Sequence, residues 1–511
     1  MQRLLATLTA ALALSTFAHA DSQSSAPIVV TRDGPVRGVQ KDGTSTFRAI
    51  PYAAPPVGAL RWRAAQKVAP WSEVRDATEF GPDCEQPTRP GSRPEHAMSE
   101  DCLTVNVLTP NLSPKEKLPV MVSIHGGAFF VGSGRFPLDA GTPRMSQLGV
   151  VMVSFNYRLG RFGFFAHPAL SKEHADEPVG NYWETDQIAA LQWVQKNIAT
   201  FGGDPAKVTI FGCSAGGSSV NLLMAARQAR GLFAHAITES GGGLFNASRP
   251  LAQAQDEARE VAKRLGADTD SAAGLEKLRE LTAEQILANE QGPPDYGAIV
   301  DGKLLTDSLP VLFAKGDINP VSYLVGSVSN DASVFGLMGF DAAVLEKRFG
   351  IRLEDVRPVY EAAGKLSDAE LLRQVQTDFI FTAGAGSLGE FAARHGRPTY
   401  VYQFAYLSDS QRGHLPGVPH GGEMAFLFDS VKQPTAKDDG VAAMMQHYWT
   451  NFAKTGDPNG AGLPTWPRFH APSAQTLVID DDTHAISAFE KARLNIWYDK
   501  WTHQSGIEVP R

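Results

Sequence analysis

The feature that most constrains the fold is an alternation of short apolar runs with stretches of helical spacing, most regular between residues 118 and 240. The run ETDQIAALQWVQKNIATFGG predicts a helix that stops at Gly202, and SAGGSSVNLLMAARQ predicts a second helix. Strands that alternate with helices pack as a mainly parallel sheet covered on both faces. The sequence therefore predicts an α/β fold. The runs that predict its strands are LPVMVSIHGG, GVVMVSFNYR, KVTIFG, HAITES, YLVGSV, TYVYQFAYL and TLVID.

Two blocks interrupt this alternation, at about residues 250–290 and 342–395. They consist mostly of charged amphipathic helix, for example DEAREVAKRL, and predict insertions that lie over or beside the sheet. Near the N-terminus, PIVVTRDGPVRGVQ resembles a hairpin and TVNVLTP alternates like a strand. Because no repeat, low-complexity tract or linker divides the chain, we expect residues 21–511 to form a single α/β domain with two helical insertions.

The first 20 residues have the pattern of a signal peptide. Arg3 supplies the positive start, residues 4–17 are mostly apolar, and Ala18-His19-Ala20 is a small-x-small cleavage site. The apolar run is shorter than the ~20 residues that a bilayer span needs, and no other stretch is long and apolar enough. We therefore expect an exported chain without a membrane span, either periplasmic or secreted.

Composition narrows the class of partner. Of the 511 residues, 43% are hydrophobic and 20% are charged, as in a soluble globular protein. The formal net charge is −8 and no basic run is present, so nucleic acid is not an expected partner. The sequence predicts no oligomeric state.

The chain has three cysteines. Cys84 and Cys102 bracket the Pro- and Gly-rich loop EQPTRPGSRPEH, which a covalent link would order, and export makes disulfides possible. We predict the pair Cys84–Cys102. Cys213 is then the odd thiol, and it is either accessible to reagents or a small buried residue.

Residues 212–216, Gly-Cys-Ser-Ala-Gly, form the pattern G-x-S-x-G between a predicted strand and a predicted helix. In that context the pattern is typical of a nucleophile elbow, a tight turn that lifts a serine hydroxyl above the edge of the sheet. The free N–H groups and the positive dipole end of the following helix favour negative charge beside it. Ser214 is therefore the candidate nucleophile.

A serine at its ordinary pKa needs a base, and the base needs an acid that orients it. In folds with such an elbow, the order along the chain is Ser, then Asp or Glu, then His. His420, in the glycine-rich loop GVPHGGEMAFLF, is the candidate base, whereas His414 in a polar segment is typical of a solvated loop. Asp331, just past the strand YLVGSV, is favoured as the acid over Asp301, whose Asp-Gly pair is typical of a turn.

Acyl transfer also needs hydrogen-bond donors for an oxyanion. The loop HGGAFFVGSG, residues 125–134, follows a strand, and its glycines let the backbone approach a substrate closely. The predicted donors are the N–H groups of Gly127 and Ala128, with that of Ala215 just after the nucleophile. No GKS/T follows to bind phosphate, and no HExxH or Cys/His metal spacing is present, so we expect no cofactor and no metal.

With these motifs the chain resembles the type-B carboxylesterases, the carboxylesterase/cholinesterase family of the α/β-hydrolase fold. FGGDPAKVTIFGCSAG is similar to the family's serine signature, and EDCLTVNVLTP is similar to its cysteine-containing one. RAIPYAAPPVGALRW, FNYRLGRFGF and FAKTGDPNGAGLPTWP also fit, so the resemblance covers nearly the whole mature chain. It implies a large, mainly parallel sheet flanked by helices. The site residues that it implies are Ser214, Asp331 and His420 for catalysis, Gly127, Ala128 and Ala215 for the oxyanion hole, and Cys84 with Cys102 for a bridge.

Three features depart from the family pattern. Cys213 stands where the family usually has a glutamate, so we expect only a weak preference for cationic, choline-type substrates. Asp331 stands where glutamate is more common; aspartate is shorter but has the same chemistry. GNYWETDQ replaces the common GNxGLxDQ, so Trp183 and Glu184 either reshape a pocket wall or are surface changes.

Together these residues predict an exported serine hydrolase that cleaves a small carboxylic ester through an acyl-enzyme. The same site could instead serve amides, carbamates or lactones. Some family members have lost the triad and act as binding proteins, but all three catalytic positions are present here, which favours an enzyme. The sequence does not identify the acyl or alcohol part of the ester.

Overall fold

The computed structural model describes residues 26–88, 95–136, 138, 143–245, 248–267, 269–290, 296–470 and 473–509. The signal peptide expected at residues 1–20 lies outside these described residues. Within them, no helix combines the length and the apolar character that crossing a bilayer requires.

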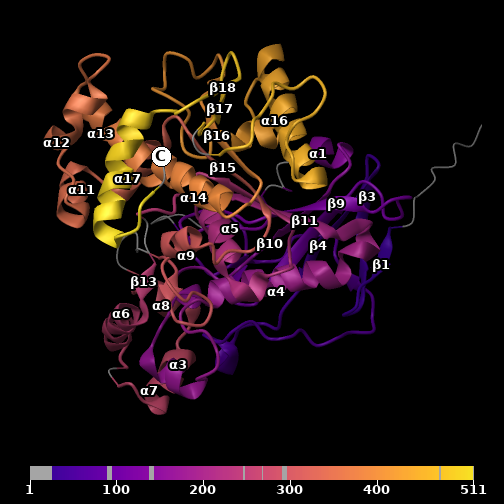
Figure 1. Ribbon diagram of the computed structural model, residues 1–511. Helices are drawn as coiled ribbons and strands as arrows, with labels where there is room; N and C mark the ends of the chain where they lie inside the picture. Colours follow the sequence, from indigo (N-terminus) through magenta and orange to yellow (C-terminus); the bar gives the residue numbers. More distant parts are fainter. Residues whose placement is uncertain are drawn as a thin grey trace, which may run out of the picture.

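A sheet of 11 strands runs through the described part of the chain (Figure 1). In spatial order its strands are β18 (His484–Ile486), β17 (Thr476–Ile479), β16 (Thr399–Phe404), β15 (Ser322–Val328), β12 (His235–Glu239), β11 (Gly203–Cys213), β9 (Leu118–Ser123), β10 (Val151–Phe155), β8 (Thr104–Thr109), β4 (Thr44–Pro51) and β3 (Val39–Lys41). From β17 to β10 every neighbouring pair is parallel, and the outer strands add antiparallel pairs at both ends. The mainly parallel sheet predicted from the sequence is confirmed.

Short strands form smaller sheets beside the large one. The expected hairpin is confirmed, because β1 (Ile28–Val30) pairs antiparallel with β2 (Pro35–Arg37), which also pairs with β5 (Arg75–Asp76). Elsewhere β6 (Asp83–Cys84) pairs with β7 (Met98–Ser99). This last pair closes the base of the loop between the two predicted disulfide partners. A further pair joins β13 (Arg249–Pro250) and β14 (Ile299–Val300).

Helices cover both faces of the large sheet (Figure 1). α5 (Ala215–Ala225) packs on β11 and β12 with α4 (Tyr182–Asn197) beside it, whereas α16 (Ala436–Thr455) packs on β9 and β11 from the other side. The apolar core is divided between the two faces of the sheet, because successive side chains of a strand point to opposite faces. Ile210 belongs to the core shared with α4 and α5, and its neighbour Phe211 belongs to the core shared with α16.

Residues 250–290 and 342–395 contain helices in two separate places at the edge of the molecule (Figure 1). The first group, α6 (Leu251–Arg264), α7 (Ala272–Glu280) and α8 (Ala283–Leu287), shares a small apolar core with α3 (Pro168–Glu173). The second group is α11 (Ala342–Phe349), α12 (Leu353–Tyr360), α13 (Asp368–Gln376), the π-helical turn η6 (Thr377–Thr382) and α14 (Ala383–Arg394). This second group extends inward, because α14 packs on β15 and β16.

The other helices of the described residues are α1 (Pro143–Gln147), α2 (Gly160–Gly163), α9 (Leu309–Lys315), α10 (Phe335–Met338), α15 (Met424–Leu427) and α17 (Lys491–Ser505), with short turns η1 (Gly58–Leu60), η3 (Ile198–Phe201), η4 (Arg227–Ala229) and η5 (Asp331–Val334).

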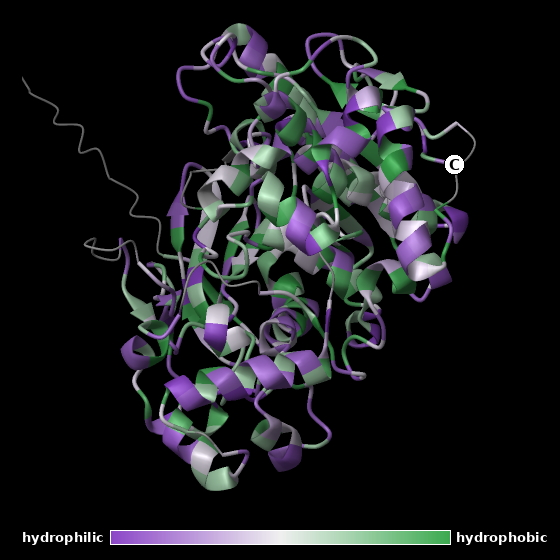
Figure 2. Ribbon diagram, turned by 90° about the vertical axis from the view of Figure 1, so that its left-hand side faces the viewer, coloured by the Kyte–Doolittle hydropathy of each residue, from purple (hydrophilic) through white to green (hydrophobic). Residues whose placement is uncertain are grey.

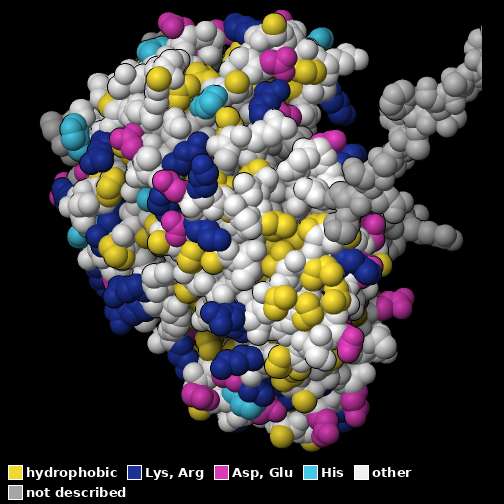
Figure 3. Space-filling view, turned by 90° about the vertical axis from the view of Figure 1, so that its right-hand side faces the viewer, with side chains coloured by type: hydrophobic (Ala, Val, Ile, Leu, Met, Phe, Trp, Pro, Cys, Tyr) yellow, Lys and Arg dark blue, Asp and Glu magenta, His cyan; other side chains and the backbone are white. Residues whose placement is uncertain are grey.

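Hydropathy follows this architecture (Figure 2). The interior strands are mainly hydrophobic, and the peripheral helices alternate between hydrophilic and hydrophobic residues, as helices with one buried face do. On the face seen in Figure 3, Lys and Arg side chains are interspersed with Asp and Glu side chains. This face is therefore not dominated by charges of one sign.

Candidate active site

Ser214 lies on the tight turn between β11 and α5. Its backbone has φ 61° and ψ −125°, a conformation that costs a non-glycine residue roughly 1–3 kcal/mol and that clusters at functional sites. Two glycines allow the turn to pack: a Cβ at Gly212 would lie 2.4 Å from the Ile124 oxygen, and one at Gly216 would lie 2.1 Å from it. The strand, turn and helix predicted around this serine are confirmed.

Asp331 and His420 form a hydrogen-bonded pair. Asp331 is fully buried at the start of η5, and its Oδ1 accepts from His420 Nδ1 at 2.7 Å. The other carboxylate oxygen, Oδ2, accepts from Ser240 Oγ and from the N–H of Val328, at 3.0 Å each. Because Asp331 takes the proton-bearing Nδ1, it leaves the Nε2 of the neutral imidazole as an acceptor.

The loops that carry this pair are joined by three hydrogen bonds. The Asn330 N–H donates to the Val418 oxygen, and the Val418 N–H donates to Ser329 Oγ, both at 2.9 Å. The His420 N–H donates to Ser333 Oγ at 2.8 Å. These bonds hold the acid and the base together although 89 positions separate them in the sequence.

The loop that carries the imidazole passes next to the elbow. A Cβ at Gly421 would lie 3.6 Å from Cys213 Sγ, so the residue after His420 lies beside the residue before Ser214. His420 Nε2 is buried and has no hydrogen-bond partner among the described residues. Catalytic hydrogen bonds are often long in a free enzyme and shorten when substrate binds. Nε2 is therefore an unoccupied acceptor on a loop that passes next to the elbow.

The π-helical turn η6 supports this pair from one side. The Phe381 ring lies against the His420 ring, with centroids 5.0 Å apart, and Thr377 Oγ1 accepts from the Ala332 N–H at 3.1 Å. Sequence reasoning did not identify these contacts. The run TDFIFT carries no local signal for a π turn, because the turn depends on how α13 and α14 are placed by the rest of the fold.

The predicted oxyanion loop lies directly against the elbow. A Cβ at Gly126 would lie 3.3 Å from Ser214 Cβ, and the next two residues, Gly127 and Ala128, have positive φ values of 108° and 54°. In the part of the chain that the structure describes, the N–H groups of Gly127, Ala128 and Ala215 donate no backbone hydrogen bond. Free backbone N–H groups beside a serine are the donors that stabilise an oxyanion.

Two of the three cysteines form the predicted disulfide, and the third is free. Cys84 and Cys102 form a disulfide. The Cys213 thiol is free and buried, and burial raises its pKa well above the ordinary value. Of the two alternatives for this residue, the structure favours a small residue that packs the elbow.

Two carboxyl groups beside Cys213 were not identified from the sequence. Glu239 is fully buried at the end of β12, where Trp449 Nε1 donates to its Oε1 at 2.8 Å, and burial raises its pKa to about 8. Burial, and then the neighbouring Glu239, also raise the pKa of Glu423, whose oxygens have no hydrogen-bond partner among the described residues. Glu239 precedes Ser240 and Glu423 follows the base by three residues, but neither position belongs to a pattern that indicates burial.

Trp183 and Glu184 are both fully buried, so the surface alternative for them is wrong. The Trp183 ring contacts those of Phe129 and Phe164, at centroid distances of 4.8 and 5.3 Å. Because Phe129 directly follows Ala128, this aromatic group adjoins the oxyanion loop. Burial raises the pKa of Glu184 to about 8.

The two rival residues lie elsewhere. Asp301 Oδ1 accepts from the N–H groups of Lys303, Leu304 and Leu305, at 2.9, 2.9 and 3.2 Å, so this carboxylate caps a turn. His414 is exposed in a turn of its own loop. The structure therefore joins the favoured acid, Asp331, to the favoured base, His420. Neither the rival acid, Asp301, nor the rival base, His414, takes part in this hydrogen bond.

Comparison with known proteins places the chain among esterases. Residues 25–497 match the model of the Carboxylesterase family. The fumonisin B1 esterase of Sphingopyxis macrogoltabida is 36% identical over 86% of this chain and 84% of its own, and the para-nitrobenzyl esterase of Bacillus subtilis is 33% identical over 89% and 95%. A solved carboxylesterase from Geobacillus stearothermophilus has a TM-score of 0.81 at 30% identity, covering 92% of this chain and 99% of that one.

These matches extend over nearly the whole chain, and the similar solved structures are carboxylesterases with the α/β-hydrolase fold. The predicted fold class and the predicted enzyme class, a carboxylic ester hydrolase, are both confirmed. The chain belongs to the carboxylesterase family.

Proposed function

We propose that this protein hydrolyses carboxylic esters through an acyl-enzyme formed on Ser214. The observation that carries the proposal is the 2.7 Å hydrogen bond between Asp331 and His420, on a loop whose next residue, Gly421, lies beside Cys213 of the elbow. This arrangement supplies a nucleophile, a base and an orienting acid, in the chain order typical of the fold.

In the acylation step, His420 Nε2 takes the proton of Ser214 as Oγ attacks the carbonyl carbon. The Asp331 carboxylate stabilises the imidazolium that forms. The free N–H groups of the oxyanion loop and the elbow stabilise the tetrahedral oxyanion, and losing one such donor typically costs about 3–4 kcal/mol. The bond to the alcohol oxygen then breaks, and His420 gives its proton to the leaving group.

Deacylation repeats this sequence with water. His420 Nε2 takes a proton from a water molecule as its oxygen attacks the acyl carbon, and the same donors stabilise the second oxyanion. The bond to Ser214 Oγ breaks, the acid leaves, and His420 returns the proton to the serine. Besides the ester and water, the proposed steps use only side chains and backbone groups of this chain.

We further propose that the preferred esters are uncharged and partly apolar. Aromatic rings adjoin the reacting groups on two sides, with Phe381 against His420 and Phe129 next to the oxyanion loop. The carboxyl groups of Glu239 and Glu423 have raised pKa values, and Cys213 carries no charge, so the elbow lacks the anion that would attract a cationic alcohol.

Hydrolysis of a short-chain p-nitrophenyl ester tests the proposal. Ser214→Ala is expected to lower kcat by at least about 10⁴-fold while circular dichroism and Tm stay unchanged, since a triad acts as a unit. Ser410→Ala, on an exposed turn, is the matched control. A fluorophosphonate is expected to add one adduct to the native chain and none to Ser214→Ala. Turnover by Ser214→Ala above the solvent rate would refute the elbow assignment.

We also propose that the chain is exported. The pattern of residues 1–20 supports this, as does the Cys84–Cys102 disulfide, which persists in oxidising compartments. Mass spectrometry of the chain from its native host is expected to give Asp21 as the N-terminal residue in the periplasmic or extracellular fraction. Uncleaved protein confined to the cytoplasm would contradict it.

A further inference from the structure

The oxyanion loop is held by a side chain that has no part in the mechanism above. Gln86 Nε2 donates to the Gly132 oxygen at 2.9 Å, and the Gly132 N–H donates to Gln86 Oε1, also at 2.9 Å. The amide thus binds both backbone groups of one residue, as a neighbouring strand does. A primary amide suits this role because it carries a donor and an acceptor side by side.

Gly132 closes the loop that begins at His125. Its φ is 126°, and a Cβ there would lie 2.4 Å from His125 Nδ1, so Gly132 is packed against the start of the loop. Between them, the N–H groups of Phe130 and Val131 both donate to the Gly127 oxygen and close a tight turn. Movement of Gly132 would therefore move the backbone that carries the oxyanion donors.

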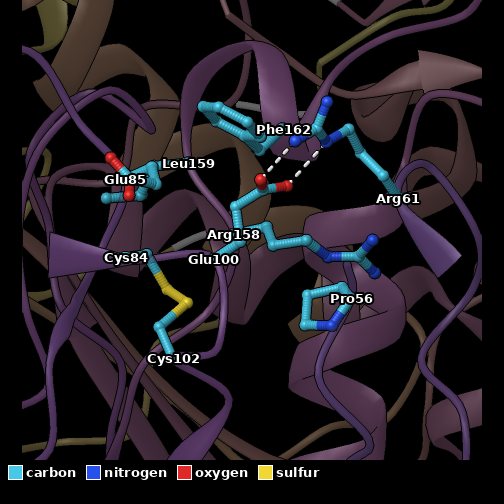
Figure 4. A pocket seen from close by; sticks show the side chains of 9 residues that line it. All are labelled: Pro56, Arg61, Cys84, Glu85, Glu100, Cys102, Arg158, Leu159 and Phe162. Carbon is cyan, nitrogen blue, oxygen red and sulfur yellow. Dashed lines mark hydrogen bonds and ion pairs between the residues drawn. A yellow bond between two sulfur atoms is a disulfide. The ribbon is translucent and has the colours of Figure 1, made fainter. Parts of the chain in front are cut away.

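Gln86 is itself anchored. Its Nε2 also donates to the oxygen of Cys84 at 3.1 Å, and Cys84 is bonded to Cys102. Figure 4 shows this disulfide at one side of a small cavity, with the ion pair between Arg61 and Glu100 at the other. Arg61 also donates to backbone oxygens at the C-terminal end of α7, so Glu100, two residues before Cys102, is tied to this helix through Arg61.

A second side chain near the disulfide, Asp83, also holds the oxyanion loop. Asp83, the residue before Cys84, accepts at Oδ1 from Ser133 Oγ at 2.5 Å and from Arg135 Nε at 3.1 Å. Asp83 and Gln86 therefore bind two successive residues of the oxyanion segment, Ser133 and Gly132. Both contacts originate within two residues of the disulfide.

We propose that Gln86 is a positioning residue for the oxyanion hole, and that the Cys84–Cys102 disulfide acts on catalysis through it. The inference rests on the proposed function. Gln86 would not touch the substrate; it fixes Gly132, and through Gly132 it fixes the N–H groups of Gly127 and Ala128. Because oxyanion donors act in the transition state and less in the ground state, their misalignment lowers kcat and leaves KM nearly unchanged.

The test compares Gln86→Ala, Gln86→Glu and a control. Gln86→Ala is expected to lower kcat by about 10- to 100-fold with KM within about 2-fold, the loss expected when a donor is displaced but present. Gln86→Glu keeps the acceptor for the Gly132 N–H but loses the donor, so its kcat is expected to be intermediate. The control is Gln195→Ala, because Gln195 Nε2 also binds two backbone oxygens, those of Pro205 and Leu232, but on α4.

A trifluoromethyl ketone separates positioning from general loss of structure. This probe forms a tetrahedral oxyanion with the serine, so its affinity for Gln86→Ala is expected to fall in parallel with kcat/KM. Wild-type kcat in Gln86→Ala, or an equal loss in Gln195→Ala, would overturn the proposal. If Ser214→Ala remains active, the proposed function itself fails; if Ser214→Ala is inactive and Gln86→Ala is fully active, only the positioning role fails.

The disulfide is tested by a double-mutant cycle. The double variant Cys84→Ser/Cys102→Ser is expected to lower kcat in the native background and to have less than about a 3-fold effect in Gln86→Ala, because coupled residues are not additive. Tm is measured for each variant, and kcat is compared at a temperature where all are folded. Independent, multiplicative effects on kcat would show that the disulfide does not act through Gln86.

Discussion

Ser240 Oγ donates to Asp331 Oδ2 at 3.0 Å, on the carboxylate oxygen opposite the one that accepts from His420. The two oxygens of this buried carboxylate thus accept hydrogen bonds from different partners. One orients the base, and the other is fixed by the end of β12 and by the backbone of β15. The orientation of the acid is therefore set by its own segment, through Val328, and by two distant segments, at Ser240 and His420.

Ser240→Ala is expected to lower kcat by about 10-fold, since a hydrogen bond to a charged group contributes roughly 1.5–3 kcal/mol and the Val328 N–H remains as a second donor. Steady-state hydrolysis of a p-nitrophenyl ester measures this. Ser410→Ala serves again as the control. Unchanged kcat in Ser240→Ala would mean that this contact does not hold the carboxylate.

Asp331→Asn is expected to lower kcat by about 10³- to 10⁴-fold. An amide can donate to His420 Nδ1, which would place the proton on Nε2 and remove the acceptor for the serine proton. Asp301→Asn, in which the rival carboxylate is changed, is expected to keep at least half of the native kcat. The reverse ranking of the two variants would identify Asp301 as the acid.

Glu184→Gln is expected to stabilise the protein more as pH rises. Burial raises the pKa of Glu184 to about 8, so the folded state holds a proton that the unfolded chain releases near pH 4.3, and stability falls as pH rises between these values. Removing the ionisable group is expected to raise the free energy of unfolding by about 2–4 kcal/mol more at pH 8 than at pH 5. Urea titrations at both pH values measure the free energy of unfolding, and Glu260→Gln, at an exposed position, is the control. A gain in stability that does not depend on pH would contradict the raised pKa of Glu184.

The Cys213 thiol is expected to resist alkylation. Burial raises its pKa well above the ordinary value, so little thiolate is present at pH 8 and reagents cannot reach it. Iodoacetamide is expected to leave both the intact mass and the hydrolysis rate of the native protein unchanged, and to add one label after unfolding in urea. Rapid labelling of the native chain would place the thiol at the surface of the site.

A matched pair of esters tests the charge of the site. Acetylcholine and 3,3-dimethylbutyl acetate have similar shapes but differ by one positive charge, so an elbow without an anion is expected to give the neutral ester an equal or higher kcat/KM. Ionic strength is expected to change the ratio of the two little. A preference for the choline ester of 10-fold or more would contradict the proposal that the preferred esters are uncharged.

Sequence patterns predicted the parts of this protein that depend on local order. The apolar runs around Ile210 predict β11, and the glycines on either side of Ser214 predict the turn that follows it. The order Ser, Asp, His then selects Asp331 and His420, which the structure joins. Each of these features is encoded within about ten residues and a known chain order.

The remaining features depend on contacts between distant segments. Glu239 and Glu423 are polar residues that are both buried beside Cys213, because Trp449 of α16 donates a hydrogen bond to Glu239 and because Glu423 begins α15, which packs on α16. In the same way, Gln86 stands in a polar loop with no pattern that links it to Gly132, 46 positions away. Such contacts are determined by tertiary structure, which local periodicity does not encode.

The hydrogen bonds from residues 329, 330 and 333 to Val418 and His420 have a consequence for how this enzyme can evolve. They fix the base from the side of the acid, so the mostly exposed stretch 409–416 that leads into it does not determine where His420 lies. Insertions, deletions and new side chains can therefore accumulate in this stretch while the proton-transfer geometry stays constant. Selection for new substrates, in nature or in the laboratory, has a segment there that can vary in length and composition without loss of the chemistry.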